Sequence, residues 1–204
     1  MLCEIFAGHF SVSGYILQSF IALLSIIRYN RGVEKNSRCT RLHIVLIEPE
    51  IPGNTGNIAR LCAATGIELH LVKPLGFSTD DKHLKRAGLD YWHLVKVHYH
   101  ENFDEVLAKY PDHNFYYCST KAPHAHTEVQ YTSEDMLVFG KESAGIPEEI
   151  LNAHWDSCVR IPMIEEARSL NLSNAVAVVA YEALRQLDFG QLEEVGPGLR
   201  MWKK

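Results

Sequence analysis

The sequence predicts an α/β fold with a mostly parallel sheet and helices on both faces. Short runs of β-branched and aromatic residues, typical of buried strands, alternate along the chain with longer segments of helical periodicity. This alternation is the pattern of a parallel sheet that helices cover on both sides. The 204 residues, 47% of them hydrophobic, are enough for one domain with a substantial core.

The predicted elements follow one another from residue 42 to residue 187. The expected strands are residues 43–47, 68–72, 94–99, 115–118, 136–139 and 158–161. The expected helices are residues 54–65, 80–87, 102–110, 147–153 and 172–187. Gly66 stops the first helix, and Pro147 opens the fourth at its first turn, where proline is tolerated. Ligands of such folds bind beyond the carboxyl ends of the strands, so the segments that follow strands are the first place to look for function.

The first forty residues differ from this pattern. Residues 16–27 are mostly apolar, but a membrane-spanning helix needs about 20 such residues. Basic residues follow the apolar run, the reverse of their order in a secretory signal peptide. We therefore expect residues 1–40 to be an atypical extension without a functional role, residues 41–190 to form the single folded domain, and residues 191–204 to form a flexible tail.

Charge and cysteine content narrow the class of protein. The formal net charge of −5 argues mildly against a nucleic-acid partner, although binding depends on the local field rather than on the total. The five cysteines form no Cys-x-x-Cys pair, which indicates a reducing cytoplasm and no disulfide framework. The histidine pairs 98/100 and 124/126 have a spacing that could hold a metal, but no cysteine or carboxylate cluster accompanies them. We expect solvated histidines and no metal.

The first candidate functional segment is residues 48–60. On a helix, Ile58 would face the core, while Gly56, Asn57 and Arg60 would lie side by side on the other face. A helix N-terminus with a small residue, an amide and a guanidinium is suited to an RNA phosphate. The alternative is a surface helix with a solvated arginine.

The second candidate segment is residues 137–147, where a strand runs into a turn bounded by Gly140 and Gly145. Glycine permits a positive φ and a close approach of a ligand to the backbone. The alternative interpretation is a tight strand-to-helix turn with no ligand.

The third candidate segment, residues 161–175, crowds polar side chains at the start of the last helix. They are Ser169, Asn171, Ser173 and Asn174. One N-cap needs only one such residue, so the others suggest contacts to a ligand, the alternative being redundant capping. The helix that follows is apolar on every side over residues 175–181, which predicts a subunit contact and a dimer.

Together with residues 85–92, these segments resemble, in this order, the motifs of the SPOUT superfamily of RNA methyltransferases. The resemblance covers about residues 42–189. It implies a trefoil knot near the C-terminus, a homodimer, and S-adenosylmethionine as the methyl donor. It further implies 2′-O-ribose methylation of the wobble nucleotide, cytidine or uridine 34, in the anticodon stem-loop of leucine tRNAs.

The resemblance also assigns individual residues. Arg60 matches the catalytic arginine, and we expect it to anchor a phosphate and stabilise the forming alkoxide rather than act as a general base. The cofactor pocket would comprise Cys118, Gly140, Ile161, Met163, Ser169 and Leu170. Motif positions without an assigned role are Asn57, Glu142, Asn171 and Ser173.

A tRNA-binding surface follows from the spacing of basic residues. Three of them lie at turn spacing on one predicted helix, and a fourth follows the strand at 115–118; they are Lys82, Lys85, Arg86 and Lys121. The alternative is a solvated helix face.

Three other functions stay open at this point. A related methyltransferase could act on another ribose of tRNA or rRNA, and a non-catalytic member could only bind RNA. An ordinary nucleotide-binding α/β protein is disfavoured, because the sequence carries no glycine-rich dinucleotide or phosphate-binding motif.

Overall fold

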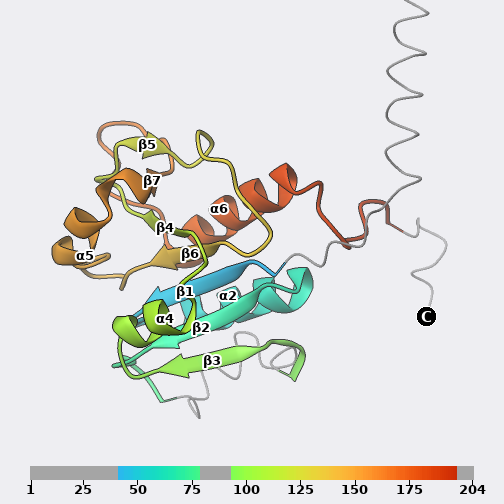
Figure 1. Ribbon diagram of the computed structural model, residues 1–204, viewed down its shortest axis with the longest axis horizontal. Coiled ribbons are helices and arrows are strands. Elements are labelled where there is room, and N and C mark those ends of the chain that lie inside the picture. Colours follow the sequence, from blue (N-terminus) through green and yellow to red (C-terminus); the bar gives the residue numbers. More distant parts are fainter. Residues whose placement is uncertain (1–40, 79–92, 197–204) are drawn as a thin grey trace, which may run out of the picture. The chain divides into compact units, whose positions relative to one another are not determined.

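The described part of the chain is built on one parallel sheet. The computed structural model describes residues 41–78 and 93–196. Seven strands pair in the order β3-β2-β1-β6-β4-β7-β5, and every pairing is parallel (Figure 1). The predicted fold class is therefore confirmed. The trefoil knot that the resemblance implies stays a prediction.

The elements lie close to their predicted positions. The strands are β1 His43–Ile47, β2 Glu68–Val72, β3 Val97–His100, β4 Phe115–Cys118, β5 His124–Ala125, β6 Met136–Phe139 and β7 Cys158–Arg160. The helices are α2 Pro52–Thr65, α4 Phe103–Lys109, α5 Glu148–Ala153 and α6 Leu172–Gln186, with a 3-10 turn at Trp155–Ser157. The two-residue strand β5 was not predicted. The helix predicted at residues 80–87 and the extension at residues 1–40 lie outside the described residues.

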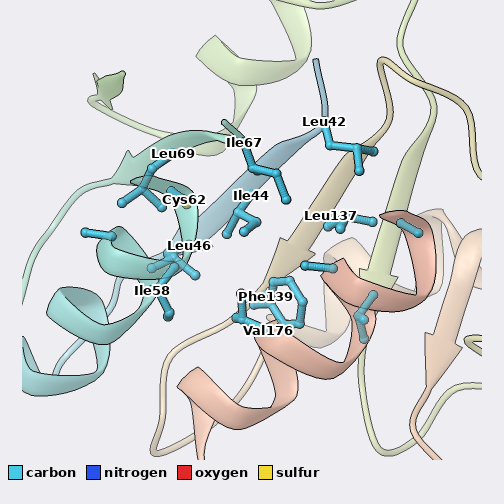
Figure 2. Close-up of a cluster of buried hydrophobic side chains, with 14 of the residues drawn as sticks. Leu42, Ile44, Leu46, Ile58, Cys62, Ile67, Leu69, Leu137, Phe139 and Val176 are labelled. Atoms are coloured by element: carbon cyan, nitrogen blue, oxygen red, sulfur yellow. The ribbon is translucent and has the colours of Figure 1, made fainter. Parts of the chain in front are cut away.

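One face of the sheet packs against α2 and α6. Alternate residues of β1, such as Ile44 and Leu46, point to this face because side chains of a strand alternate between its two sides. They meet Ile58 of α2 and Val176 of α6 in a continuous buried cluster (Figure 2). Each fully buried side chain of this size contributes about 1.5–3 kcal/mol, so this cluster holds both helices on the sheet.

The opposite face packs against α4 and α5. Val45 and Ile47 of β1 point to this side and join a second buried cluster with Val106 of α4 and Leu151 of α5. Helices on both faces, as predicted, thus follow directly from the two-residue alternation of apolar side chains along β1.

Helix α6 differs from its prediction. Val176, Val179 and Ala180 are buried against the sheet, but Val178 and Tyr181 are 41% and 47% exposed. The helix is therefore not buried all round within one chain, and its outer side carries apolar surface. A subunit contact on this surface stays a prediction.

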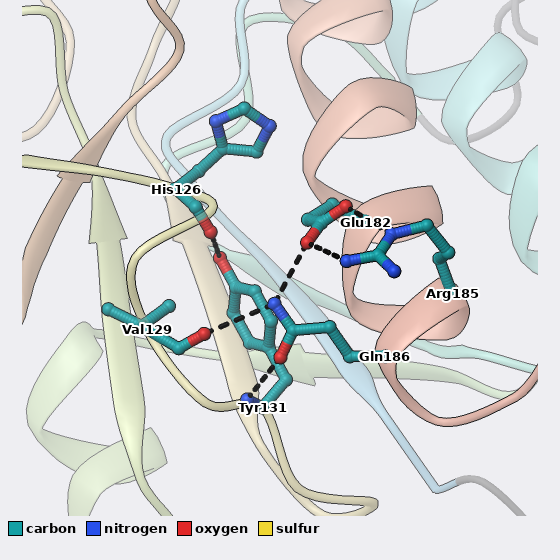
Figure 3. Close-up of polar contacts among 6 residues, drawn as sticks. All are labelled: His126, Val129, Tyr131, Glu182, Arg185 and Gln186. Carbon is teal, nitrogen blue, oxygen red and sulfur yellow. Dashed lines mark hydrogen bonds and ion pairs between the residues drawn. The ribbon is translucent and has the colours of Figure 1, made fainter.

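A polar network fastens the end of α6 to the segment between β5 and β6 (Figure 3). The Gln186 side chain donates to Val129 O at 3.1 Å and accepts from Tyr131 N at 3.1 Å. Its amide also donates to Glu182, which accepts two hydrogen bonds from Arg185 at 2.9 Å each. These contacts fix the C-terminal end of α6 against a segment that has no regular structure of its own.

The C-terminal end of the described chain has no helix or strand. Residues 191–196 are turn and irregular backbone, while residues 197–204 lie outside the described part. No helix within residues 41–78 and 93–196 is both long and apolar enough to cross a membrane.

The expectation of solvated histidines is wrong for His100 and His126, which are 1% and 7% exposed. Both side chains are buried in the folded chain, although the imidazole ring is polar.

Candidate active site

A cavity of about 470 Å³ opens beyond the carboxyl ends of three adjacent strands, β6, β4 and β7. Three segments far apart in the sequence line most of it: residues 118–121 after β4, residues 139–146 at and after β6, and residues 161–172 after β7. This is where ligands of parallel α/β folds bind. The predicted post-strand segments thus converge on one cavity.

The six residues that the resemblance assigns to the cofactor pocket all line this cavity. They are Cys118, Gly140, Ile161, Met163, Ser169 and Leu170. Glu142, Asn171 and Lys121 line it as well. The positions of these residues are established; their contact with a cofactor stays a prediction.

The turn after β6 closes tightly on itself. A Cβ atom on Gly140 would lie 2.0 Å from the carbonyl carbon of Gly145, so no side chain fits there. Gly145 has a φ of 73°, in the left-handed region that favours glycine, and its N–H donates to Lys141 O at 2.8 Å. Gly140 is therefore required by the backbone of its own tight turn, and the approach of a ligand to it stays a prediction.

Glu142 of this turn caps helix α2. The residue at the N-cap position of α2 is Ile51, whose apolar side chain cannot cap a helix. The Glu142 carboxylate instead accepts hydrogen bonds from Glu50 N at 2.8 Å, Ile51 N at 3.3 Å and Asn54 Nδ2 at 2.9 Å. A negative charge at this end also complements the helix dipole. No local pattern in the sequence predicts this cap, because cap and helix are about 90 residues apart.

A second set of contacts ties the same two loops together in the opposite direction. The Glu50 carboxylate accepts hydrogen bonds from the backbone N–H of Ser143 at 2.9 Å and from its hydroxyl at 2.8 Å. These two bonds hold the pKa of Glu50 below its usual value. Lys141 also pairs with Glu48 at 2.8 Å. The loops after β1 and β6 are therefore joined by reciprocal carboxylate contacts.

Asn54 extends this network to the start of α6. Its Oδ1 accepts a hydrogen bond from Asn171 Nδ2 at 2.9 Å, and Asn171 Oδ1 accepts from the N–H and hydroxyl of Ser173 at 3.0 and 2.7 Å. Because a carboxylate only accepts, Glu142 fixes the orientation of the Asn54 amide, and Asn54 in turn fixes that of Asn171. All three candidate segments thus share one hydrogen-bonded chain. Asn54 belongs to the first candidate segment, but the sequence assigns it no role, because the role depends on its burial at the first helical turn.

The residues of α2 divide between this network and the exposed side of the helix. Arg60 and Asn57 are exposed, and neither is among the residues that line the cavity. Gly56, which we expected beside them on the outer face, is buried. Helix α2 packs against α6 as well as the sheet, so more than one of its faces is covered. Arg60 therefore lies on the exposed outer side of α2.

The four basic residues of the predicted tRNA surface are only partly described. Lys121 lies on the cavity wall and forms an ion pair with Glu148, which lowers the pKa of that glutamate. Lys82, Lys85 and Arg86 lie outside the described residues. The predicted tRNA surface therefore stays a prediction, with Lys121 as its described member.

Cys118 contributes a neutral side chain to the cavity. Burial raises the pKa of its thiol well above the usual value, so it stays protonated near neutral pH. Since the thiolate is the nucleophilic form, Cys118 is suited to packing against a ligand and not to covalent catalysis.

Comparison with known proteins identifies the family. The model of the SpoU rRNA methylase family matches residues 41–181. The tRNA (cytidine(34)-2'-O)-methyltransferase of Escherichia coli K12 is 50% identical over 72% of this chain and 95% of its own length.

Solved structures agree with this match. A structure from a study of "2-OH methylation of C/U34 on tRNA" has a TM-score of 0.70 and 46% identity, covering 73% of this chain and 97% of that one. The fold is also that of the SpoU methyltransferase AviRb of Streptomyces viridochromogenes, solved with the cofactor AdoMet, at a TM-score of 0.64 and 24% identity, covering 76% of this chain and 60% of that one. The predicted resemblance to SPOUT methyltransferases is thereby confirmed, and the chain belongs to the SpoU methylase family.

Proposed function

We propose that this protein transfers a methyl group from S-adenosylmethionine to the ribose 2′-oxygen of nucleotide 34, cytidine or uridine, in leucine tRNAs. The observation that carries the proposal is the convergence of three post-strand segments on one cavity, with the matching motif residues on its wall. This chain aligns with nearly the whole length of relatives that are named for this activity on cytidine 34, and it is 50% identical to them.

The cavity fits the proposed methyl donor in size and in chemistry. Its volume of about 470 Å³ lies within the roughly 300–1,000 Å³ of small-molecule sites. Ile161, Met163 and Leu170 offer apolar surface to an adenine ring, whereas Ser169 and the backbone of the turn at residues 140–145 offer polar groups to hydroxyls and charged termini. A protein of the same fold has been solved with AdoMet, which supports this choice.

The chain's own residues would align the substrates. When bound, S-adenosylmethionine supplies a methyl group on a sulfonium for in-line attack by the ribose oxygen. Holding donor and ribose in line accounts for several kcal/mol of the barrier, and the network from Glu142 to Asn171 would keep the cavity wall in place for it. Arg60 would hold the neighbouring phosphate and stabilise the forming alkoxide, since a guanidinium binds such oxygens in a planar fork.

Binding of the tRNA would extend beyond the cavity. Because Arg60 is exposed on α2, the RNA backbone has to contact the outer side of that helix for the arginine to act. Lys121, with Lys82, Lys85 and Arg86, would add positive charge for the anticodon stem-loop. A homodimer formed through the exposed apolar side of α6 would present two such surfaces. The protein would act in the cytoplasm, where this substrate occurs.

Labelling of the target ribose tests the proposal. Purified protein is incubated with labelled S-adenosylmethionine and unmodified leucine tRNA, and the labelled nucleotide is mapped by nuclease digestion and mass spectrometry. We expect one 2′-O-methyl group at position 34. Label at another ribose would support a related methyltransferase, and tRNA binding without cofactor binding in calorimetry would support a non-catalytic RNA-binding protein.

The dimer is tested separately. Tyr181→Glu places a charge on the exposed side of α6, where Tyr181 is 47% exposed. We expect a monomer in light scattering, with tRNA affinity reduced at least tenfold. A monomeric variant with normal methylation would overturn the proposed dimeric tRNA site.

A further inference from the structure

A cluster of histidines lies on the sheet, away from the cavity. His43 of β1 is the register partner of Glu68 of β2, and His70 of β2 is the partner of His98 of β3. Glu68 and His70 are two residues apart, so their side chains share one face of the sheet. His43 and His70 are 5% and 0% exposed, which is unusual for polar side chains and calls for a physical reason.

Three of these side chains bring possible ligand atoms close together. His43 Nδ1 lies 2.9 Å from His70 Nε2, and one ligand atom each of His43, Glu68 and His70 lie within 4.8 Å of one another. Two imidazoles and a carboxylate are the three protein ligands of a common class of zinc site. None of these three residues lines the cavity. We propose that His43, Glu68 and His70 bind a Zn²⁺ ion that fastens β1 to β2.

The donor atoms of the cluster suit a metal. His43 Nδ1 and His70 Nε2 face each other across 2.9 Å, and a neutral imidazole binds zinc through the lone pair of one ring nitrogen. The partly buried Glu68 carboxylate also contacts Lys96 Nζ at 2.9 Å and His98 Nε2 at 2.8 Å, which hold it in place. The site therefore offers two ring nitrogens and one carboxylate oxygen.

Binding of the ion would replace one hydrogen bond. When His70 donates to His100, the proton in the 2.9 Å gap between His43 Nδ1 and His70 Nε2 belongs to His43 Nδ1. Zn²⁺ would take its place and this proton would move to Nε2 of the same ring, so each ring keeps one proton and binds the ion through a lone pair. Two nitrogens on a tetrahedral zinc are about 3.3 Å apart, from Zn–N bonds of about 2.0–2.1 Å, so the two nitrogens have to separate by less than half an ångström while both rings turn toward the ion.

Outer contacts hold the ligands in the required form. His70 Nδ1 lies 3.0 Å from His100 Nε2, and donation along this contact leaves the lone pair of His70 on Nε2, facing His43. The far nitrogen of His100 is 3.5 Å from Glu105, too far for a good hydrogen bond but close enough for attraction. Zinc-bound histidines commonly donate their other N–H in this manner.

His113 is a candidate for the fourth ligand. The His113 ring lies 5.5 Å from that of His43, centroid to centroid, and its Nδ1 is buried without a hydrogen-bond partner among the described residues. Either this nitrogen or a water molecule would complete four-coordination. The N₂O donor set suits Zn²⁺ rather than Mg²⁺ or Ca²⁺, which prefer oxygen ligands.

Metal titration of the full chain tests the site without cofactor or tRNA. Protein freed of metal by a chelator is titrated with ZnCl₂ against a chromophoric competitor, and with CoCl₂ while its visible absorption is recorded. We expect one equivalent of Zn²⁺, an intense four-coordinate Co²⁺ spectrum, and a rise of several degrees in the melting temperature on adding zinc.

Three variants locate the ion. His43→Asn and Glu68→Gln should weaken zinc binding at least tenfold and remove the Co²⁺ spectrum, with circular dichroism confirming that they fold. His124→Asn, at a partly exposed histidine on β5, should bind as the wild type does. The proposal is overturned if the wild type binds no zinc, which would make the cluster a hydrogen-bonded chain of imidazoles, or if His43→Asn binds it equally. Neither outcome bears on the methylation assay.

Discussion

The carboxylate of Glu142 accepts a hydrogen bond from the side chain of Asn54 at 2.9 Å and so joins the turn after β6 to the first turn of α2. The same carboxylate also receives two backbone N–H groups at the start of this helix. One side chain therefore shapes the cavity wall and caps a helix from a distant part of the chain.

Replacement of this carboxylate by an amide should weaken both functions. In Glu142→Gln, only one oxygen stays to accept from three donors, and the new NH₂ group faces another N–H. We expect the free energy of unfolding to fall by about 1–2 kcal/mol, since hydrogen bonds to charged groups are among the stronger ones. Cofactor affinity should fall with it. Urea unfolding and calorimetry measure the two effects, and Glu193→Gln, at an exposed glutamate near the C-terminus, is the control. Equal stability of the two variants would contradict the capping role.

A methyl group at Gly140 should disrupt the cavity. Gly140→Ala would place its Cβ 2.0 Å from backbone of the same turn, so the turn has to open. We expect cofactor binding to weaken at least tenfold in calorimetry, with the fold retained. Gly53→Ala is a matched control, because a Cβ there has no atom within 4 Å. If Gly140→Ala binds cofactor as Gly53→Ala does, the turn does not determine the shape of the site.

Arg60 should affect turnover and leave cofactor binding unchanged. It lies on the exposed side of α2, outside the cavity lining. Arg60→Lys keeps the charge but loses the planar fork, and we expect its turnover to fall at least tenfold while its affinity for S-adenosylmethionine stays within twofold. Single-turnover methylation and calorimetry separate the two. The control is Arg41→Lys, at an exposed arginine paired only loosely with Glu134 at 3.9 Å. Near-normal turnover of Arg60→Lys would show that the fork is unnecessary.

Glu182 should make stability depend on acid pH. Hydrogen bonds from Arg185 lower the pKa of Glu182 from 4.5 to about 2, although burial opposes them. A folded-state pKa below the unfolded value stabilises the protein above pH 4.5, and this stabilisation is lost as the pH falls from 4.5 towards 2. Glu182→Gln should be less stable by about 1 kcal/mol at pH 7. Melting temperatures from pH 7 to pH 2 should converge for the two proteins, and a constant difference would refute this assignment.

Most of the fold could be predicted, because each strand and helix carries its own local signal. The β-branched run at His43–Ile47 and the glycine at the end of α2 are examples. Strand β5 has no such run: its two residues pair with β7 only because the chain passes beside Val159 and Arg160. The start of α2 at Pro52, two residues before its predicted start, depends on a carboxylate about 90 residues away.

Most residues of the candidate site could be predicted from the sequence, but the hydrogen bonds between them could not. Polar residues after strands identified most of the cavity wall, since the carboxyl ends of parallel strands share one edge. The partners of Asn54 and Glu50 could not be found, because they depend on which strands are neighbours in space. The histidine cluster was missed for the same reason: His43 and His70 are 27 residues apart and meet only through the pairing of β1 with β2.

Helix α6 begins at the cavity, beside Asn171, and ends at Gln186. The Gln186 side chain forms hydrogen bonds with the backbone of Val129 and Tyr131. Its 15 residues form a stiff rod about 22 Å long. A shift of one end along the helix axis would therefore displace the other. Closure of the pocket around a ligand would tighten the remote segment at residues 126–131, and slower amide hydrogen exchange there would report occupancy of a pocket that the segment never touches.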